Sequence, residues 1–453
     1  MGNNQRHLLL IVTIALGVLL NPLNSSMIAV ALSRIQQDFQ LSFSDASWLI
    51  STYYLASAVG QPVMGKLSDI FGRKRLFLLG LTMVAVASIL APLSPGFGWL
   101  IGFRIIQSLG SSTLFPAGMG IVRQVITHKQ AKALGVLSVF SSVSAAFGPS
   151  IGGFLIQFGD WPAIFFINFP FIILSFVLSI KVLPKDPPPN RKDFHLDYVG
   201  ILLFTGMIMS WLLFFMSFEE TVSWWKLLLS LVVSFLFYHY EVRQKDPFID
   251  VLGLKKNINV TFVYIQFILV NILFYSLFFG VPTYLQTNLK LDAKNTGIMM
   301  LSIAGFGMII APIAGKWIDQ SGSKPILFVG SISLIIGTLM ILTIQDESSL
   351  GWIFFALSFL GVSNGFNNLG MQTALYDFVT PEETSAASGL FMTSRYIGTI
   401  LSSSLLGILF GKNVTTENFH IIGVIGSIIG VCILLLTIRL PNRKRVRGKI
   451  GEH

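Results

Sequence analysis

Apolar residues form blocks of about 20 along almost the whole chain, and short polar connections separate these blocks. A block of this length is long enough for an α-helix to cross the hydrocarbon core of a bilayer. The pattern predicts fourteen spanning helices. Their ranges are 8–30, 46–64, 76–92, 97–122, 133–157, 161–183, 198–218, 222–240, 258–281, 294–315, 325–343, 350–376, 386–410 and 420–440.

The composition indicates a membrane protein and excludes a soluble enzyme. Hydrophobic residues make up 53% of the 453 residues and charged residues 11%, and the mean hydropathy is +0.73. A soluble domain has about 25% charged residues. The single cysteine, Cys432, lies within an apolar block, so the sequence contains no disulfide framework.

The net charge of +10 is concentrated on one side of the predicted membrane. Fourteen spans place both termini on the same side, and 24 of the 31 Lys and Arg residues fall there. Because basic loops stay in the cytoplasm, we expect cytoplasmic termini and a plasma-membrane location, and no nucleic acid partner. Arg6, the first apolar run and Ala29–Ala31 also resemble a signal peptide, but these alanines lie far beyond the run, which favours a retained helix.

Two loops repeat each other. Residues 65–74 and 315–324 carry Gly, Lys, Asp, Gly and Lys at identical offsets, after the second and the tenth predicted span. The repeat predicts two six-helix halves, at 1–183 and 258–453, with an inserted two-helix segment at 184–257. A simple basic anchor with turn glycines is the alternative interpretation of these loops.

The motifs resemble those of the major facilitator superfamily. Gly65–Arg75 is similar to its G-x-L-x-D-x-x-G-R-K-x loop, and Arg104–Gly110 to its fourth-helix R-x-x-Q-G-x-G motif, with Ser108 in place of a glycine. Gly148–Gly153 resembles the G-P-x-x-G-G motif of its antiporters. Together with Trp161–Pro170 and fourteen spans, these motifs resemble the fourteen-span drug:proton antiporter family.

This resemblance implies an all-α membrane protein with two six-helix halves and two inserted helices. It implies a monomer that sits among membrane lipid and exports small amphipathic drugs, cationic or zwitterionic, in exchange for protons. No cofactor is expected. In one respect the chain departs from the family: Asn24 stands where an aspartate is common, and an asparagine cannot bind and release a proton.

Polar residues at helical spacing within the predicted spans are the candidates for a substrate cleft. Intramembrane polar groups are costly and usually face a cavity or a partner. Hydrogen bonds between helices are the alternative role, mainly for the Ser and Thr residues. The predicted cleft residues are Asn21, Asn24, Gln107, Asn364, Asn367, Asn368, Gln372 and Arg395.

Proton coupling needs a titratable group, yet none of the 21 acidic residues falls clearly at mid-membrane. Glu219 and Glu220, at the outer end of the seventh span, are the first candidates for proton binding. Asp38, after the first span, is an alternative at an outer gate. Arg104 lies far from the ends of its span and would lower the pKa of a nearby carboxyl group, although a structural role on backbone carbonyls is also open.

Two motifs are candidates for gating. In the repeated loop, an Asp beside a helix end and a neighbouring Arg form a latch that can break. In the fifth span, small residues permit close helix contact and the proline frees a carbonyl, so the helix can flex. The predicted gating residues are Gly65, Asp69, Gly72, Arg73, Gly148, Pro149, Gly152 and Gly153.

Other functional classes find less support in the sequence. There is no G-x-x-x-x-G-K-[ST] loop for a nucleotide-driven pump, and the six histidines show no metal-binding spacing, so no metal site is predicted. A lipid or glycolipid flippase of the same fold is the main alternative. A membrane-bound enzyme or sensor would need a catalytic cluster or signalling domain, which the sequence does not show.

Overall fold

The computed structural model describes residues 3–41, 43–126, 130–186, 197–217, 222–245, 247–291, 293–410 and 414–441. Within these ranges all regular secondary structure is helical. The chain divides into two compact units. Unit 1 comprises residues 1–195 and 379–393, and unit 2 comprises residues 196–378 and 394–453.

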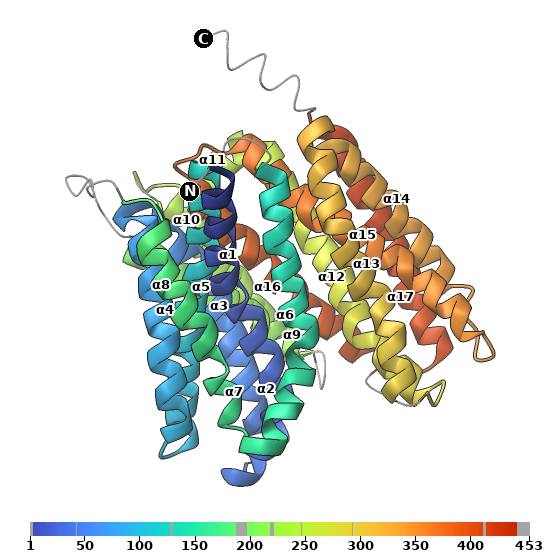
Figure 1. Cartoon of the computed structure of the whole chain (residues 1–453). Coiled ribbons are helices and arrows are strands. Elements are labelled where there is room, and N and C mark those ends of the chain that lie inside the picture. Colours follow the sequence, from blue (N-terminus) through green and yellow to red (C-terminus); the bar gives the residue numbers. More distant parts are fainter. Residues whose placement is uncertain are drawn as a thin grey trace. The chain divides into compact units, whose positions relative to one another are not determined.

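The helices follow one another along the chain with short connections (Figure 1). Those of unit 1 are α1 (Asn3–Val18), α2 (Leu20–Asp38), α3 (Phe43–Phe71), α4 (Arg73–Leu90), the 3₁₀ turn η1 (Ala91–Leu93), α5 (Phe97–Val125), α6 (Gln130–Gly159), α7 (Ala163–Phe166) and α8 (Asn168–Val182). Those of unit 2 are α9 (Tyr198–Met216), α10 (Trp224–Glu241), α11 (Val251–Lys256), α12 (Ile258–Thr287), α13 (Ala293–Ser321), α14 (Ser323–Ile341), α15 (Leu350–Phe378) and α17 (Thr416–Arg439). The remaining helix, α16 (Thr384–Phe410), begins in unit 1 and ends in unit 2.

Proline explains the interruption of the first predicted span. Pro22 has no N–H to donate to the carbonyl of Val18, and its ring crowds that carbonyl. The helix is therefore interrupted at Leu19, between α1 and α2. The sixth span is likewise built from two helices, α7 and α8, and Pro170 lies in the first turn of α8, where no intrahelical donor is needed.

Each of the fourteen predicted ranges overlaps one helix or a consecutive pair. In the part of the chain that the structure describes, ten helical stretches are long and apolar enough to cross a membrane. The stretches at α3, α6, α10 and α16 are not among these ten. Multiple spans are therefore confirmed, and the number fourteen stays a prediction.

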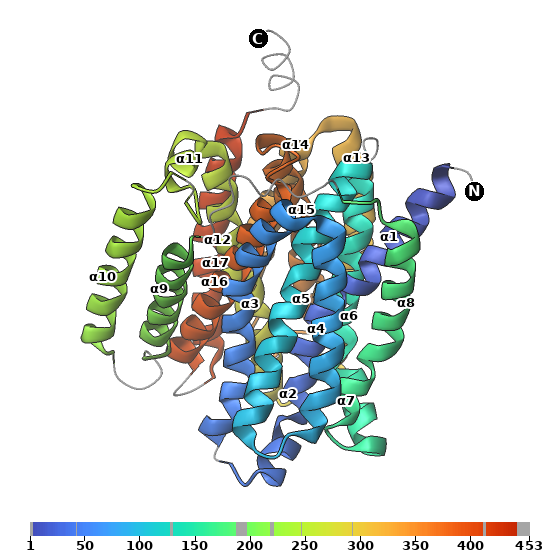
Figure 2. The ribbon, with the colours of Figure 1, turned by 90° about the vertical axis from the view of Figure 1, so that its left-hand side faces the viewer.

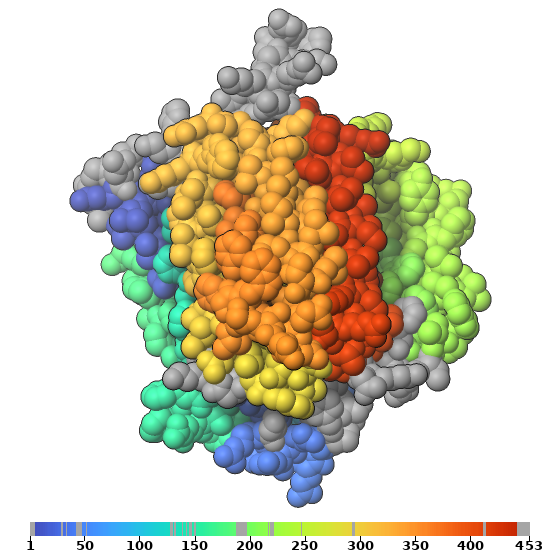
Figure 3. Space-filling view, turned by 90° about the vertical axis from the view of Figure 1, so that its right-hand side faces the viewer, coloured from blue at the N-terminus to red at the C-terminus, as the bar shows by residue number. Residues whose placement is uncertain are grey.

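The outer face of unit 2 is apolar. Exposed large hydrophobic residues recur every three or four positions, which places them in one stripe along each helix. Figure 3 shows α14 in orange and α17 in red side by side on this face. An exposed apolar surface of this extent fits lipid and not water. The residues are Phe328, Ile332, Ile336 and Leu339 on α14 and Ile421, Val424, Ile428, Val431, Leu435 and Ile438 on α17.

Inside each unit, glycines let the helices approach closely. A Cβ added to Gly80 of α4 would lie 2.7 Å from the carbonyl oxygen of Gly110 of α5, so any larger residue would push the two helices apart. In unit 2, a Cβ added to Gly361 of α15 would lie 2.4 Å from the carbonyl oxygen of Ser302 of α13. Such backbone contact replaces the hydrophobic effect as a packing force within a membrane.

The predicted insertion forms a helix pair. Figure 2 shows α9 and α10 side by side at the edge of unit 2. The Trp211 indole N–H donates to Ser234 Oγ at 3.0 Å, and the rings of Phe204 and Phe237 lie 5.7 Å apart. At one end the Tyr240 hydroxyl donates to Asp197 Oδ1 at 3.0 Å, which fastens the end of α10 to the start of α9.

The two repeated loops have the same local structure. Gly72 precedes α4 with φ of 109°, and Gly322 precedes α14 with φ of 84°, a region that favours glycine. Two residues later, the Lys74 ammonium donates to the carbonyls of Ile180 and Leu183, at the end of α8. Lys324 makes the equivalent bonds, both 2.7 Å, to the carbonyls of Ile438 and Leu440 at the end of α17. The internal repeat is therefore structural as well as sequential.

We expect Gly322→Ala to lower the free energy of unfolding by about 1–2 kcal/mol, because a Cβ is strained at positive φ. Gly72→Ala should lower it further. The added Cβ would lie 2.4 Å from Cγ of Asp186, whose carboxylate accepts from the backbone N–H groups of Lys74 and Arg75. Thermal unfolding of the purified protein in detergent measures both changes.

The control is Gly305→Ala. Gly305 lies inside α13 with open space where a Cβ would stand, and alanine is the better helix former. This variant should unfold no earlier than the wild type. A Gly322→Ala protein as stable as the wild type would show that the strained glycine is not needed.

Candidate functional site

Unit 1 contains a buried polar network between its helices. Four of its members are asparagine, glutamine and serine side chains from four different helices, and each is at most 3% exposed. In a membrane such groups have no water to bond, so each must find a partner within the protein. They are Asn24 on α2, Ser88 on α4, Gln107 on α5 and Asn168 on α8.

The centre of this network is a pair of amides that bond to each other in both directions. Asn24 Nδ2 donates to Asn168 Oδ1 at 3.0 Å, and Asn168 Nδ2 donates to Asn24 Oδ1 at 2.9 Å. Asn24 also donates to the carbonyl of Leu20, and its Oδ1 accepts a second bond from Gln107 Nε2 at 3.2 Å. Ser88 Oγ accepts from Gln107 and from Asn168, which closes the cluster.

Arg104 is the charged member and is only 1% exposed. Its Nη1 donates to Gln107 Oε1 at 2.6 Å, its Nη2 contacts the Asn24 carbonyl at 3.4 Å, and its guanidinium carbon lies 4.2 Å from the centre of the Tyr53 ring. The sequence has no acidic residue from position 70 to position 159, which covers all of α4, α5 and α6. The positive charge is therefore stabilised by an amide oxygen and an aromatic face.

A second row of hydroxyl groups adjoins this network. Asn21 Nδ2 donates to Ser111 Oγ at 2.9 Å, and the Tyr53 hydroxyl lies 3.0 Å from the same oxygen. The hydroxyls of Ser57 and Ser108 lie 2.7 Å apart, and Ser108 donates to the carbonyl of Tyr53. Of the predicted cleft residues, unit 1 thus brings Asn21, Asn24 and Gln107 together around Arg104.

The first repeated loop binds the start of α16. Arg73 and Asp69 form an ion pair at 2.9 Å, and Asp69 Oδ2 accepts from the backbone N–H of Ala386 at 2.9 Å. Arg73 donates to the carbonyls of Gly120 and Pro381, at 2.8 and 2.6 Å. Burial raises the pKa of Asp69, which lies beyond the predicted span, and the charge of Arg73 opposes this increase.

Two further contacts fix the same segment. Arg123 of α5 donates to the carbonyl of Val379 at 2.6 Å and to Thr384 Oγ1 at 3.0 Å. Gly65 also lies against it, since an added Cβ would stand 2.4 Å from the carbonyl oxygen of Ser385. Residues 379–386 are therefore held by α3, α4 and α5 through two arginines, one carboxylate and a close backbone contact.

The predicted glycines of the fifth span pack on α2 to different degrees. A Cβ added to Gly148 would overlap Ser26 Oγ, at 1.8 Å, and one added to Gly152 would lie 3.3 Å from Met27. At Gly153 the nearest atom would be 3.8 Å away, so a methyl group fits there. The side chain of Pro149 lies outside the described residues.

In unit 2 the predicted amides lie along α15. Asn367 is fully buried and donates to Ser363 Oγ at 2.9 Å, while Gln372 Nε2 lies 3.5 Å from the Tyr376 hydroxyl. Asn368 is half-buried. The half-buried Asn364 lines a small cavity.

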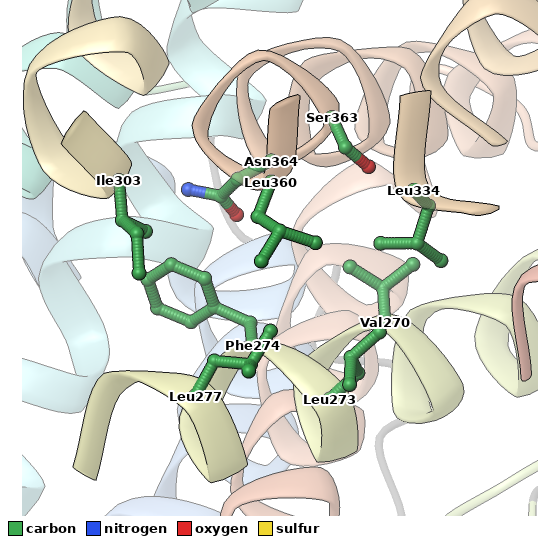
Figure 4. Close-up of a pocket in the computed structure, with 9 residues that line it drawn as sticks. All are labelled: Val270, Leu273, Phe274, Leu277, Ile303, Leu334, Leu360, Ser363 and Asn364. Atoms are coloured by element: carbon green, nitrogen blue, oxygen red, sulfur yellow. The ribbon is translucent and has the colours of Figure 1, made fainter. Parts of the chain in front are cut away.

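Figure 4 shows this cavity, in which apolar side chains of α12 face Asn364 and Leu360 of α15. Its volume is about 10 Å³, enough for roughly one water molecule. Asn364 Oδ1 is buried and has no hydrogen-bond partner among the described residues, so it is the acceptor available to such a molecule. The other lining residues are Val270, Leu273, Phe274, Leu277, Ile303, Leu334 and Ser363.

Arg395 lies on the part of α16 that belongs to unit 2. Its Nε donates to the Tyr275 hydroxyl at 2.8 Å, and its guanidinium carbon lies 5.6 Å from the centre of the Tyr275 ring. Both side chains are half-buried. Tyr275 continues into an aromatic row on α12, with Phe274 at 5.2 Å and Phe278 at 6.4 Å between ring centres.

The predicted carboxylates are not gathered into one site by the described residues. Asp38 ends α2, and its Oδ2 accepts from the Trp161 indole N–H at 2.6 Å, which ties the end of α2 to the connection before α7. Glu219 and Glu220 lie outside the described residues. Their role stays a prediction.

Sequence reasoning missed several partners of the predicted residues. Asn168 and Ser88 complete the amide cluster, yet neither belongs to the polar stripes from which the cleft residues were predicted. Tyr53 was missed for a different reason, since aromatic residues are common throughout the chain. The Trp161–Pro170 motif was a signal for Asn168.

We expect Asn24→Leu and Asn168→Leu each to lower the free energy of unfolding by about 1–3 kcal/mol, because each removes two hydrogen bonds of the other buried amide. The double variant should lose less than the sum of the two, since it removes both members. Thermal unfolding in detergent gives this comparison. Asn24→Leu combined with Thr205→Val, a hydroxyl that bonds within α9, should be additive. Additivity in the amide pair would contradict its coupling.

Known proteins similar to this chain are transporters. The chain is 45% identical to "Uncharacterized MFS-type transporter YwoD" of Bacillus subtilis (strain 168), over 94% of this chain and 95% of that protein. It is 28% identical to the riboflavin transporter RibZ of Clostridioides difficile (strain 630), over 91% and 90%. With the multidrug efflux pump LfrA of Mycolicibacterium smegmatis it shares 27% identity, over 88% and 79%.

The fold also matches solved structures. The human organic anion transporter MFSD10 (TETRAN) superposes with a TM-score of 0.67 at 14% identity, over 96% of this chain and all of that chain. This likeness concerns the fold alone. The family model of the Major Facilitator Superfamily matches residues 14–403. Because this match covers most of the chain, the protein belongs to the major facilitator superfamily and is a multi-pass membrane transporter, not an enzyme.

Proposed function

We propose that this chain is a secondary active exporter of amphipathic small molecules, which it exchanges for protons by alternating access. The similarity to LfrA, a multidrug efflux pump, carries this proposal, because it extends over 88% of the chain. The proposal includes fourteen spans, a plasma-membrane location, cytoplasmic termini and a monomeric protein.

The site geometry supports transport of a molecule with both polar and apolar parts. One predicted cleft residue, the half-buried Arg395, has its polar group next to the aromatic ring of Tyr275. Such groups adapt to different polar partners, while rings bind flat apolar surfaces. A site of this kind suits several compounds better than one.

The contacts of residues 379–386 support a gate. Asp69, Arg73 and Arg123 hold this segment mainly through backbone carbonyls and one backbone N–H. Such bonds can break and reform when the segment moves. Because the segment leads directly into α16, its release would free the start of a helix that carries Arg395.

The purified protein in proteoliposomes should move an amphipathic fluorescent dye, such as ethidium or a zwitterionic compound, when a proton gradient is imposed. Liposomes without protein and a protonophore are the controls. Movement that needs the gradient supports proton exchange. If no compound moves under any gradient while labelled lipids cross the bilayer, the flippase alternative is correct.

The carboxylates can be assigned by the same assay. We expect Glu219→Gln or Glu220→Gln to reduce gradient-driven efflux by at least about tenfold, because only a titratable group exchanges protons. Asn24→Ala should reduce it less, since this residue has no proton to exchange. Wild-type rates for both glutamine variants and for their combination would remove these residues from the mechanism.

A further inference from the structure

We propose that the exported compound carries a carboxylate, that this carboxylate binds the Arg395 guanidinium, and that Tyr275 and its aromatic neighbours hold an adjoining ring of the compound. The inference rests on the proposed export function and narrows it. The family resemblance implies cationic or zwitterionic compounds. Of these, the transporter would prefer compounds that carry a negatively charged group.

Arg395 lies near the middle of its helix, α16. Eleven residues of α16 precede it and fifteen follow it, which places it about 16 Å from one end and about 22 Å from the other. An arginine side chain cannot reach a membrane surface over that distance. A half-buried arginine at this depth therefore faces a cavity or a partner and not lipid.

Tyr275 orients the Arg395 guanidinium. Tyr275 accepts the Nε–H at 2.8 Å and places its ring beside the guanidinium. This contact fixes the plane of a group that recognises carboxylates through two parallel N–H donors. A lysine would keep the charge and lose this geometry.

Acidic residues are scarce in the helices α12, α13, α15 and α16. Neither α12 nor α16 contains an acidic residue, and in α13 and α15 the acidic residues are Asp319 and Asp377, within the last three positions of each helix. In unit 1 the other deeply placed arginine, Arg104, is held by an amide and a tyrosine. Neither α12 nor α16 therefore carries a negative charge that would compete with an anionic ligand for Arg395.

The aromatic row on α12 offers a binding surface for the ring of the proposed compound. The Tyr275 ring next to Arg395 lies 5.2 Å from the ring of Phe274 at an interplanar angle of 82°. Phe278 lies 5.8 Å from Phe274 and is nearly parallel to it, at 26°. A flat ring whose carboxylate is at Arg395 would find both edges and faces to contact within a few ångströms.

A matched pair of dyes tests this inference. A rhodamine with a free carboxylate and its methyl ester share the same ring system and differ by one negative charge. We expect the wild-type full-length chain in proteoliposomes to prefer the acid by about 10- to 100-fold in kcat/KM, after subtraction of leakage from empty liposomes. Arg395→Gln should abolish the preference for the acid over the ester.

Two variants sharpen the comparison. Arg439→Gln removes an exposed arginine at the end of α17 and should keep the full preference. Tyr275→Phe keeps the ring and loses the hydroxyl acceptor, so the preference should fall partly. If the Arg395→Gln variant transports neither dye, fluorescence polarisation measures the binding of the acid and of the ester to the detergent-solubilised variant. A retained preference for the acid contradicts the inference, and loss of the preference supports it.

Failure of this inference is distinguishable from failure of the export proposal. A wild-type protein that moves the ester as well as the acid, or better, remains an exporter and has no carboxylate site at Arg395. A wild-type protein that moves neither dye, nor ethidium, under any gradient overturns both proposals.

Discussion

A polar group inside a bilayer has no water to bond, and this constraint explains most of the structure. Helices meet it for the backbone. Side chains in the helices meet it by bonding one turn back, as Thr13 does to the carbonyl of Leu9 and Ser331 to that of Leu327. An amide has a second donor and an acceptor that this one bond does not satisfy, and in Asn24 both are met by Asn168.

The same constraint governs the helix ends, where the last carbonyls and first N–H groups have no intrahelical partner. Asp186 accepts from two N–H groups at the start of α4, and Lys74 donates to two carbonyls at the end of α8. These residues join the ends of α4 and α8 and so fix the helices that contribute Ser88 and Asn168. Lys324 does the same for α17, which explains why the lysine recurs in the repeat.

The sequence predicted what depends on local pattern. Hydropathy located the helices, and identical offsets located Gly72 and Gly322, whose backbone angles both require glycine. Helical spacing and the family resemblance together pointed to Asn24, Arg104 and Gln107. Partners 144 residues apart, such as Asn24 and Asn168, depend on tertiary packing, which no periodicity encodes. The number of spans stays a prediction, because α3, α6, α10 and α16 are not among the ten apolar stretches found in the described residues.

Asn24 changes the chemistry that this position can perform. Its Nδ2 donates to Leu20 and Asn168, and its Oδ1 accepts from Asn168 and Gln107, so the amide needs both its donor and its acceptor atoms. An ionised carboxylate has no donor and could not make the bond that Asn24 Nδ2 donates to Asn168 Oδ1. The network is therefore built around a neutral amide, and the charge of Arg104 is balanced without an acid. Residue 24 cannot exchange a proton with Arg104, so in the proposed antiport another group would carry the proton.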